Sequence, residues 1–142
     1  MKAEQYLRQA ERLNADINDK MAELEQLKSL RLSITASLQG AGGGSGGDRL
    51  CAITAKILDM EAELNAMIDT YVDLRKEIAE TVAMVQDAKL RTLLQKIYLD
   101  LGHKPQKVIA MEMHYSRQHI DRLHKQALEA VDVILRKRGR RS

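Results

Sequence analysis

The chain has 142 residues, of which 44% are hydrophobic and 30% charged, a balance that excludes a disordered chain. Trp and Phe are absent, and residues 1–39 and 48–101 contain neither Gly nor Pro. Sandwiches and barrels need turn residues about every 8–12 positions, so all-β folds are excluded. The sequence predicts an all-α protein.

Charge is unevenly distributed along the chain. The formal net charge is +3, but residues 1–87 hold 10 Lys and Arg against 15 Asp and Glu, whereas residues 88–142 hold 13 against 5. The second half therefore carries a balance of +8. A basic half of this kind indicates contact with a polyanion, although charge alone fits a solvated surface equally well.

The sequence favours a cytoplasmic protein. Cys51 is the single cysteine and cannot form an internal disulfide, which suits a reducing compartment. Residues 1–5 lack the apolar region of a signal peptide. No stretch approaches the ~20 apolar residues of a membrane span, so we expect no membrane contact.

Residues 1–39 predict a long first helix. Apolar residues recur at alternating steps of three and four, which is typical of a coiled-coil seam. The seam consists of Ala3, Tyr6, Ala10, Leu13, Ile17, Leu24, Leu27, Ile34 and Leu38. Lys20 and Arg31 interrupt it, and polar residues at such positions usually set register or oligomeric state.

Residues 40–47 contain six of the eight glycines and predict a flexible linker. A phosphate-binding loop would need a following Lys-Ser/Thr pair and a preceding strand, and both are missing. Residues 48–87 predict a second helix, with Asp48 as its N-cap. Its seam consists of Leu50, Ile53, Ile57, Met60, Leu64, Met67, Tyr71, Leu74, Ile78, Thr81 and Val85.

Two helices of similar length joined by a flexible loop most simply form an antiparallel coiled-coil hairpin. Met21, Leu30, Leu58 and Met84 flank the two seams and would stay partly open in a single hairpin. Self-association would cover them, so we expect a homodimer. Pairing of each helix with its copy in another chain is the alternative.

Residues 88–135 predict a three-helix domain of the helix-turn-helix type. Residues 88–101 form its first helix, with Leu90, Leu93, Leu94, Ile97 and Leu101 facing inward. Gly102 ends this helix, and Pro105 suits the first turn of the next one.

The helix-turn-helix motif itself covers residues 108–123. Ala110 is the small residue where two helices cross, and buried apolar residues are expected at Ile109, Met113, Tyr115, Ile120 and Leu123. The left-handed turn falls on His114, a residue type enriched at positive φ. Ser116 then caps the second helix.

The second helix of the motif would be the recognition helix. Its candidate DNA-binding residues are Ser116, Arg117, Gln118, His119, Asp121, Arg122, Lys125 and Gln126. Arg pairs with guanine and Gln with adenine in the major groove, whereas Lys104, Lys107 and Lys125 are better placed for phosphates. Residues 136–142 form a basic tail with Arg136, Lys137, Arg138, Arg140 and Arg141, which either follows the DNA backbone or is a solubilising end.

No enzyme, cofactor or metal site is expected. The three histidines at positions 114, 119 and 124 rotate by about 140° from one to the next on a helix and cannot face one metal ion. Acidic residues are scattered over helix faces, and no nucleophile, base and oxyanion donors come together.

The stretch from Leu90 to Leu128 resembles region four of sigma factors, most clearly at Val108-Ile109-Ala110, Tyr115-Ser116-Arg117 and Leu123-His124-Lys125-Gln126-Ala127-Leu128. Nearly the whole chain, including residues 69–78, is similar to small regulators of temperate phages of Gram-positive bacteria, near the late-transcription activators of the ArpU and RinA kind. Many relatives have Asn or Gly where this chain has His114. The resemblance implies a DNA-binding transcription regulator of phage or prophage promoters in a bacterial host, one that contacts double-stranded DNA and RNA polymerase.

The sequence thus predicts a dimeric, sequence-specific DNA-binding regulator whose coiled coil spaces two recognition helices. One alternative is an interaction protein that docks on RNA polymerase or another host protein without reading bases. A small terminase-like packaging subunit is the other alternative, although such subunits usually carry the DNA-binding part first.

Overall fold

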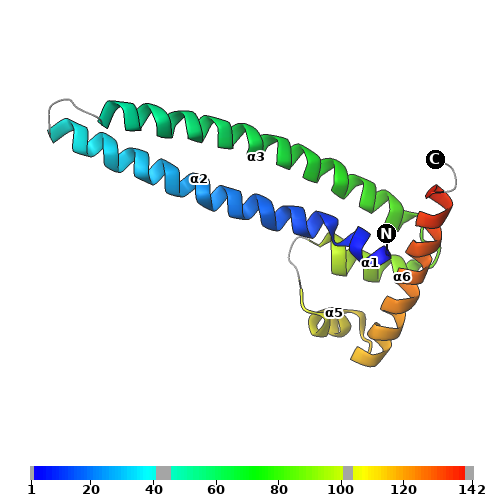
Figure 1. Ribbon diagram of the computed structural model, residues 1–142. Coiled ribbons are helices and arrows are strands. Elements are labelled where there is room, and N and C mark those ends of the chain that lie inside the picture. Colours follow the sequence, from blue (N-terminus) through cyan, green and yellow to red (C-terminus); the bar gives the residue numbers. More distant parts are fainter. Residues whose placement is uncertain (1, 41–45, 101–103, 140–142) are drawn as a thin grey trace. The chain divides into compact units, whose positions relative to one another are not determined.

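The computed structural model describes residues 2–40, 46–100 and 104–139, which form helices and their connections without a β-strand (Figure 1). The predicted all-α class is confirmed. Residues 41–45 of the predicted linker, the predicted stop at Gly102, and Arg140 and Arg141 of the tail lie outside the described residues. Among the described helices, none is both long and apolar enough to cross a membrane.

The chain divides into two compact units. Residues Arg12–Tyr71 form one, here termed the two-helix unit, and Met1–Glu11 combines with Val72–Ser142 in the other, the terminal unit. In chain order the elements are α1 (Ala3–Leu7), α2 (Gln9–Gly40), α3 (Gly46–Ala83), α4 (Ala88–Leu94), the π-helical turn η1 (Gln95–Leu99), α5 (Gln106–Met113) and α6 (Arg117–Gly139).

In the two-helix unit, α2 and α3 lie side by side and run in opposite directions (Figure 1). Ile17 and Leu24 of α2 form one buried cluster with Ile57 and Leu64 of α3. All four residues belong to the seams that the three-four spacing predicted. Lys20, which interrupts the first seam, forms an ion pair with Glu63 of the neighbouring helix.

The ends of the long helices differ from the prediction. The first helix is not continuous, because α1 stops at Leu7 and Arg8 adopts φ −84° and ψ −4°, away from regular helical values. The Arg8 guanidinium pairs with Glu4 and Glu11 on either side of this break. The prediction of Asp48 as an N-cap is wrong, since glycine permits helical dihedrals and α3 already begins at Gly46.

In the terminal unit, α6 packs against α1, α4 and α5. The apolar residues buried there include Leu7, Ile78, Val82, Leu93, Leu94, Ile109, Ala110, Ile120, Leu123, Ala127 and Val131. The spacing of the last four, in steps of three and four, gives α6 one continuous buried stripe. Its other faces are therefore left for solvent or a partner.

Both ends of the chain take part in the terminal unit. The Ala3 amide donates a 2.9 Å hydrogen bond to Asp132 Oδ1 on α6. The hydroxyl of fully buried Thr81 donates to the Glu77 carbonyl, so it accepts from Tyr6 Oη at 2.9 Å. The compact unit that contains the predicted domain of residues 88–135 thus also includes the N-terminal segment and the end of α3.

The two-helix unit offers a matched test of its core. Ile57 of α3 is 1% exposed, whereas Leu32 of α2 is 71% exposed. We expect Ile57→Ala to lower the free energy of unfolding by about 2–4 kcal/mol, because it leaves a cavity. Leu32→Ala should change it by less than about 0.5 kcal/mol. Urea denaturation followed by circular dichroism measures both, and equal losses would contradict this packing.

Candidate nucleic-acid interface

The turn between α5 and α6 has the geometry of a Schellman motif. His114 lies in the left-handed region at φ 60° and ψ 38°. Its amide donates to the Met111 carbonyl at 3.2 Å, and the Tyr115 amide donates to the Ala110 carbonyl at 3.0 Å. These are the two hydrogen bonds that define this helix ending. The prediction of a left-handed residue at His114 is confirmed.

Ser116 starts the following helix. Its Oγ accepts a hydrogen bond from the His119 amide at 3.1 Å, and its carbonyl accepts from Ile120 at 3.0 Å. The predicted capping role of Ser116 is therefore confirmed. Together, the turn and the cap fix the direction in which α6 leaves α5.

The buried stripe of α6 determines which predicted site residues face outward. Ile120 and Leu123 are buried on the core side. The exposed predicted residues at the start of α6 are Ser116, Arg117, Gln118, Asp121, Arg122, Lys125 and Gln126. His119 is only partly exposed, because its ring packs edge-on against Tyr115 with the centroids 4.7 Å apart. The structure thus brings most of the predicted residues together on one exposed surface.

Lys104 lies just before α5, and Lys107 lies in its first turn. Both side chains are exposed. Lys104 Nζ lies 2.6 Å from a Glu112 carboxylate oxygen, and Lys96 Nζ lies 2.9 Å from the other oxygen. These hydrogen bonds raise the pKa of Lys104 and lower that of Glu112. Because the Glu112 carboxylate pairs with both ammonium groups, the positive charge that Lys96 and Lys104 present to a polyanion is smaller than the sequence suggests.

The predicted basic tail is a helix as far as the structure describes it. α6 continues through Gly139, so Arg136, Lys137 and Arg138 are helical residues. Arg138 Nη1 donates to Tyr6 Oη at 3.4 Å. The helix thus runs past residue 135, the predicted start of the tail, without a break.

One polar contact of the terminal unit was missed in the sequence. Tyr98 Oη and His124 Nε2 are 2.7 Å apart, and the Arg8 guanidinium lies 5.6 Å from the centre of the Tyr98 ring. Ile97 was predicted to face inward, but Tyr98 is buried more deeply. The π-helical turn η1, whose hydrogen bonds span five residues, shifts the register here.

The described residues contain no group of three or more His, Cys, Asp or Glu side chains that is arranged to hold a metal ion. Comparison with protein-family models, curated proteins and solved structures gives no match for this chain. The arguments for its function therefore come from its own residues.

Substitution of His114 tests the left-handed conformation of the turn between α5 and α6. We expect His114→Gly to raise the free energy of unfolding by about 0.5–1 kcal/mol, because glycine adopts positive φ without steric cost. His114→Ala keeps a Cβ and should give no gain. Chemical denaturation of the two variants measures the difference. A gain of the same size with Ala would contradict a left-handed residue at this position.

His124 gives the terminal unit a pH dependence. Burial lowers the pKa of His124 in the folded state. The unfolded chain, with a His pKa of about 6.5, therefore binds a proton at higher pH than the folded chain. We expect the stability present above about pH 6.5 to fall as the pH is lowered through this range. Between pH 7.5 and 5, the urea midpoint of His124→Gln should fall less than that of the wild-type protein. An equal fall in both proteins would contradict a role of His124 in this pH dependence.

Proposed function

We propose that the protein is a sequence-specific DNA-binding transcription regulator of phage or prophage origin, acting by binding rather than catalysis. The observation that carries this proposal is the first turn of α6. There the left-handed turn at His114 and the Ser116 cap set the direction of the helix. Its exposed residues include Arg117, Gln118 and Arg122. A major groove admits such a helix, and its N-terminal residues meet the base edges first.

The proposed roles follow from side-chain chemistry. Arg117 and Arg122 donate pairs of hydrogen bonds to guanine, and Gln118 recognises adenine. Lys107 and Lys125 contact phosphates, which position the protein without reading sequence. Lys104 contributes less in this proposal, because Glu112 holds its ammonium group.

The finer architecture is part of the same proposal. An α2–α3 coiled-coil hairpin joined to a helix-turn-helix domain would form a homodimer and set the spacing of two recognition helices. Exposed Met21, Leu30 and Leu58 on the long helices supply apolar surface for self-association. The phage origin, the bacterial cytoplasm as the place of action, and contact with RNA polymerase rest on the sequence resemblance.

A protein partner is the second candidate. Met111 is 68% exposed and Val108 is also exposed, and both lie on α5 beside the proposed DNA-reading helix. An apolar surface of this kind suits docking on RNA polymerase or another host protein. In that case, substitution of the two arginines would leave the biological effect intact, whereas Met111→Asp would remove it.

Binding to labelled DNA fragments from around the gene, across a salt series, tests the proposal. We expect specific binding that competitor DNA does not abolish. Arg117→Ala/Arg122→Ala should reduce discrimination between the specific site and other DNA by about 1–3 kcal/mol per arginine, roughly five- to 150-fold for each. The matched control is Arg12→Ala/Arg49→Ala, which removes the same charge from exposed positions of the two-helix unit.

Two results would contradict base reading. In the first, binding is weak at every sequence and disappears at moderate salt. In the second, both double variants lose affinity equally, which would mean that only total charge matters.

A further inference from the structure

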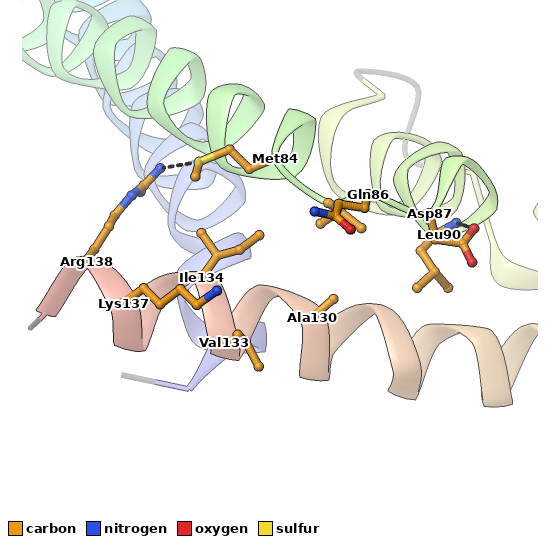
Figure 2. A pocket seen from close by; sticks show the side chains of 10 residues that line it. Met84, Gln86, Asp87, Leu90, Ala130, Val133, Ile134, Lys137 and Arg138 are labelled. Carbon is orange, nitrogen blue, oxygen red and sulfur yellow. Dashed lines mark hydrogen bonds between the residues drawn. The ribbon is translucent and has the colours of Figure 1, made fainter.

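A hollow of about 520 Å³ lies within the terminal unit, away from the first turn of α6. Met84, Val85, Gln86, Asp87 and Leu90 line one side, and Ala130, Val133, Ile134, Lys137 and Arg138 of α6 line the other (Figure 2). Small-molecule sites in proteins typically have volumes of about 300–1,000 Å³. The hollow is therefore large enough for a small ligand.

The walls of the hollow are mainly apolar. Met84 is 56% exposed and Val133 is 45% exposed, although both side chains are hydrophobic. Single exposed apolar residues are ordinary on a protein surface. Here, however, they line the same hollow as Leu90 and Ile134. An apolar ligand body would remove this surface from water.

Two cations lie at one end of these apolar walls. Lys137 and Arg138 are neighbours near the end of α6 (Figure 2). Among the described residues, Arg138 donates hydrogen bonds to two neutral groups, Tyr6 Oη at 3.4 Å and Met84 Sδ at 3.6 Å, and these do not compensate its charge. Basic residues also complement the C-terminal end of a helix, but that role requires no apolar hollow beside them.

Asp87, the acidic residue in the lining of the hollow, caps a helix. Asp87 Oδ1 accepts hydrogen bonds from the amides of Lys89 and Leu90, at 2.8 and 3.4 Å, and thereby caps α4. Figure 2 shows Asp87 at the α4 side and the two cations toward the end of α6. The lining thus has an apolar middle and a cationic end.

We propose that this hollow binds a small aliphatic carboxylate. The hydrocarbon chain would lie against Leu90, Val133 and Ile134, and the carboxylate would pair with Lys137 and Arg138. Charge-assisted hydrogen bonds between cations and a carboxylate are about twice as strong as those between neutral groups. This site is independent of the proposed DNA-reading surface, which is built at the opposite end of α6.

Isothermal titration calorimetry of the full chain with decanoate tests the proposal, and decyltrimethylammonium serves as the probe with the same chain and the opposite charge. We expect saturable binding of decanoate at a ratio of one per chain and at least tenfold weaker binding of the cation. Val133→Trp should abolish binding by filling the hollow. Lys137→Gln should raise the Kd about three- to tenfold through loss of a charged hydrogen bond. Lys56→Gln, an exposed residue of the two-helix unit, is the charge-matched control and should leave the Kd unchanged.

Several outcomes would overturn the proposal. Absence of saturable decanoate binding would do so, as would equal binding of the two probes, which would indicate apolar adsorption only. Binding that survives both Val133→Trp and Lys137→Gln would place the ligand elsewhere. Light scattering provides a separate check: if Val133→Trp dissociates a wild-type dimer, a second copy of the chain covers the hollow.

Discussion

The buried stripe along α6 is the constraint on which the terminal unit depends. Ile120, Leu123, Ala127 and Val131 lie on one side of a helix that packs against α1, α4 and α5. A helix with one side fixed in this way has no freedom to rotate, so its remaining side chains have set directions. Exposure of the polar residues of its first turns is thus a consequence of how this stripe packs.

The two ends of α6 are held by different means. At its start, backbone hydrogen bonds and the Ser116 cap act within a few residues. Toward its end, Asp132 accepts a hydrogen bond from Ala3, and Arg138 contacts Tyr6, residues more than 125 positions away in sequence. Tyr6 in turn donates to buried Thr81, so α1, α3 and α6 share one chain of polar contacts. Long-range contacts of this kind make the terminal unit one compact body.

Sequence reasoning succeeded where the determinants are local or periodic. The three-four spacing predicted the helices and the residues that form the core of the two-helix unit, and residue type predicted the turn at His114 and the Ser116 cap. The sequence did not indicate contacts between residues that are far apart in the chain and meet only in the folded structure. Nothing near Arg138 in sequence indicates Tyr6 as a partner, and nothing near Lys104 indicates that Glu112 shares its carboxylate with Lys96.

The charge balance of the C-terminal half therefore overstates the charge available to a polyanion. Lys96 and Lys104 share the Glu112 carboxylate, and Arg91 donates hydrogen bonds to the Val85 and Gln86 carbonyls. Lys137, near the end of α6, is separated from Arg117 by about 30 Å along the helix, at ~1.5 Å per residue. The exposed cations beside the first turns of α6 are few, so the DNA contact proposed above is a small and directed one rather than a broad basic surface. The specificity of such a contact depends on the geometry of individual arginines rather than on total charge. Non-specific binding, by contrast, depends mainly on total charge and is therefore sensitive to salt.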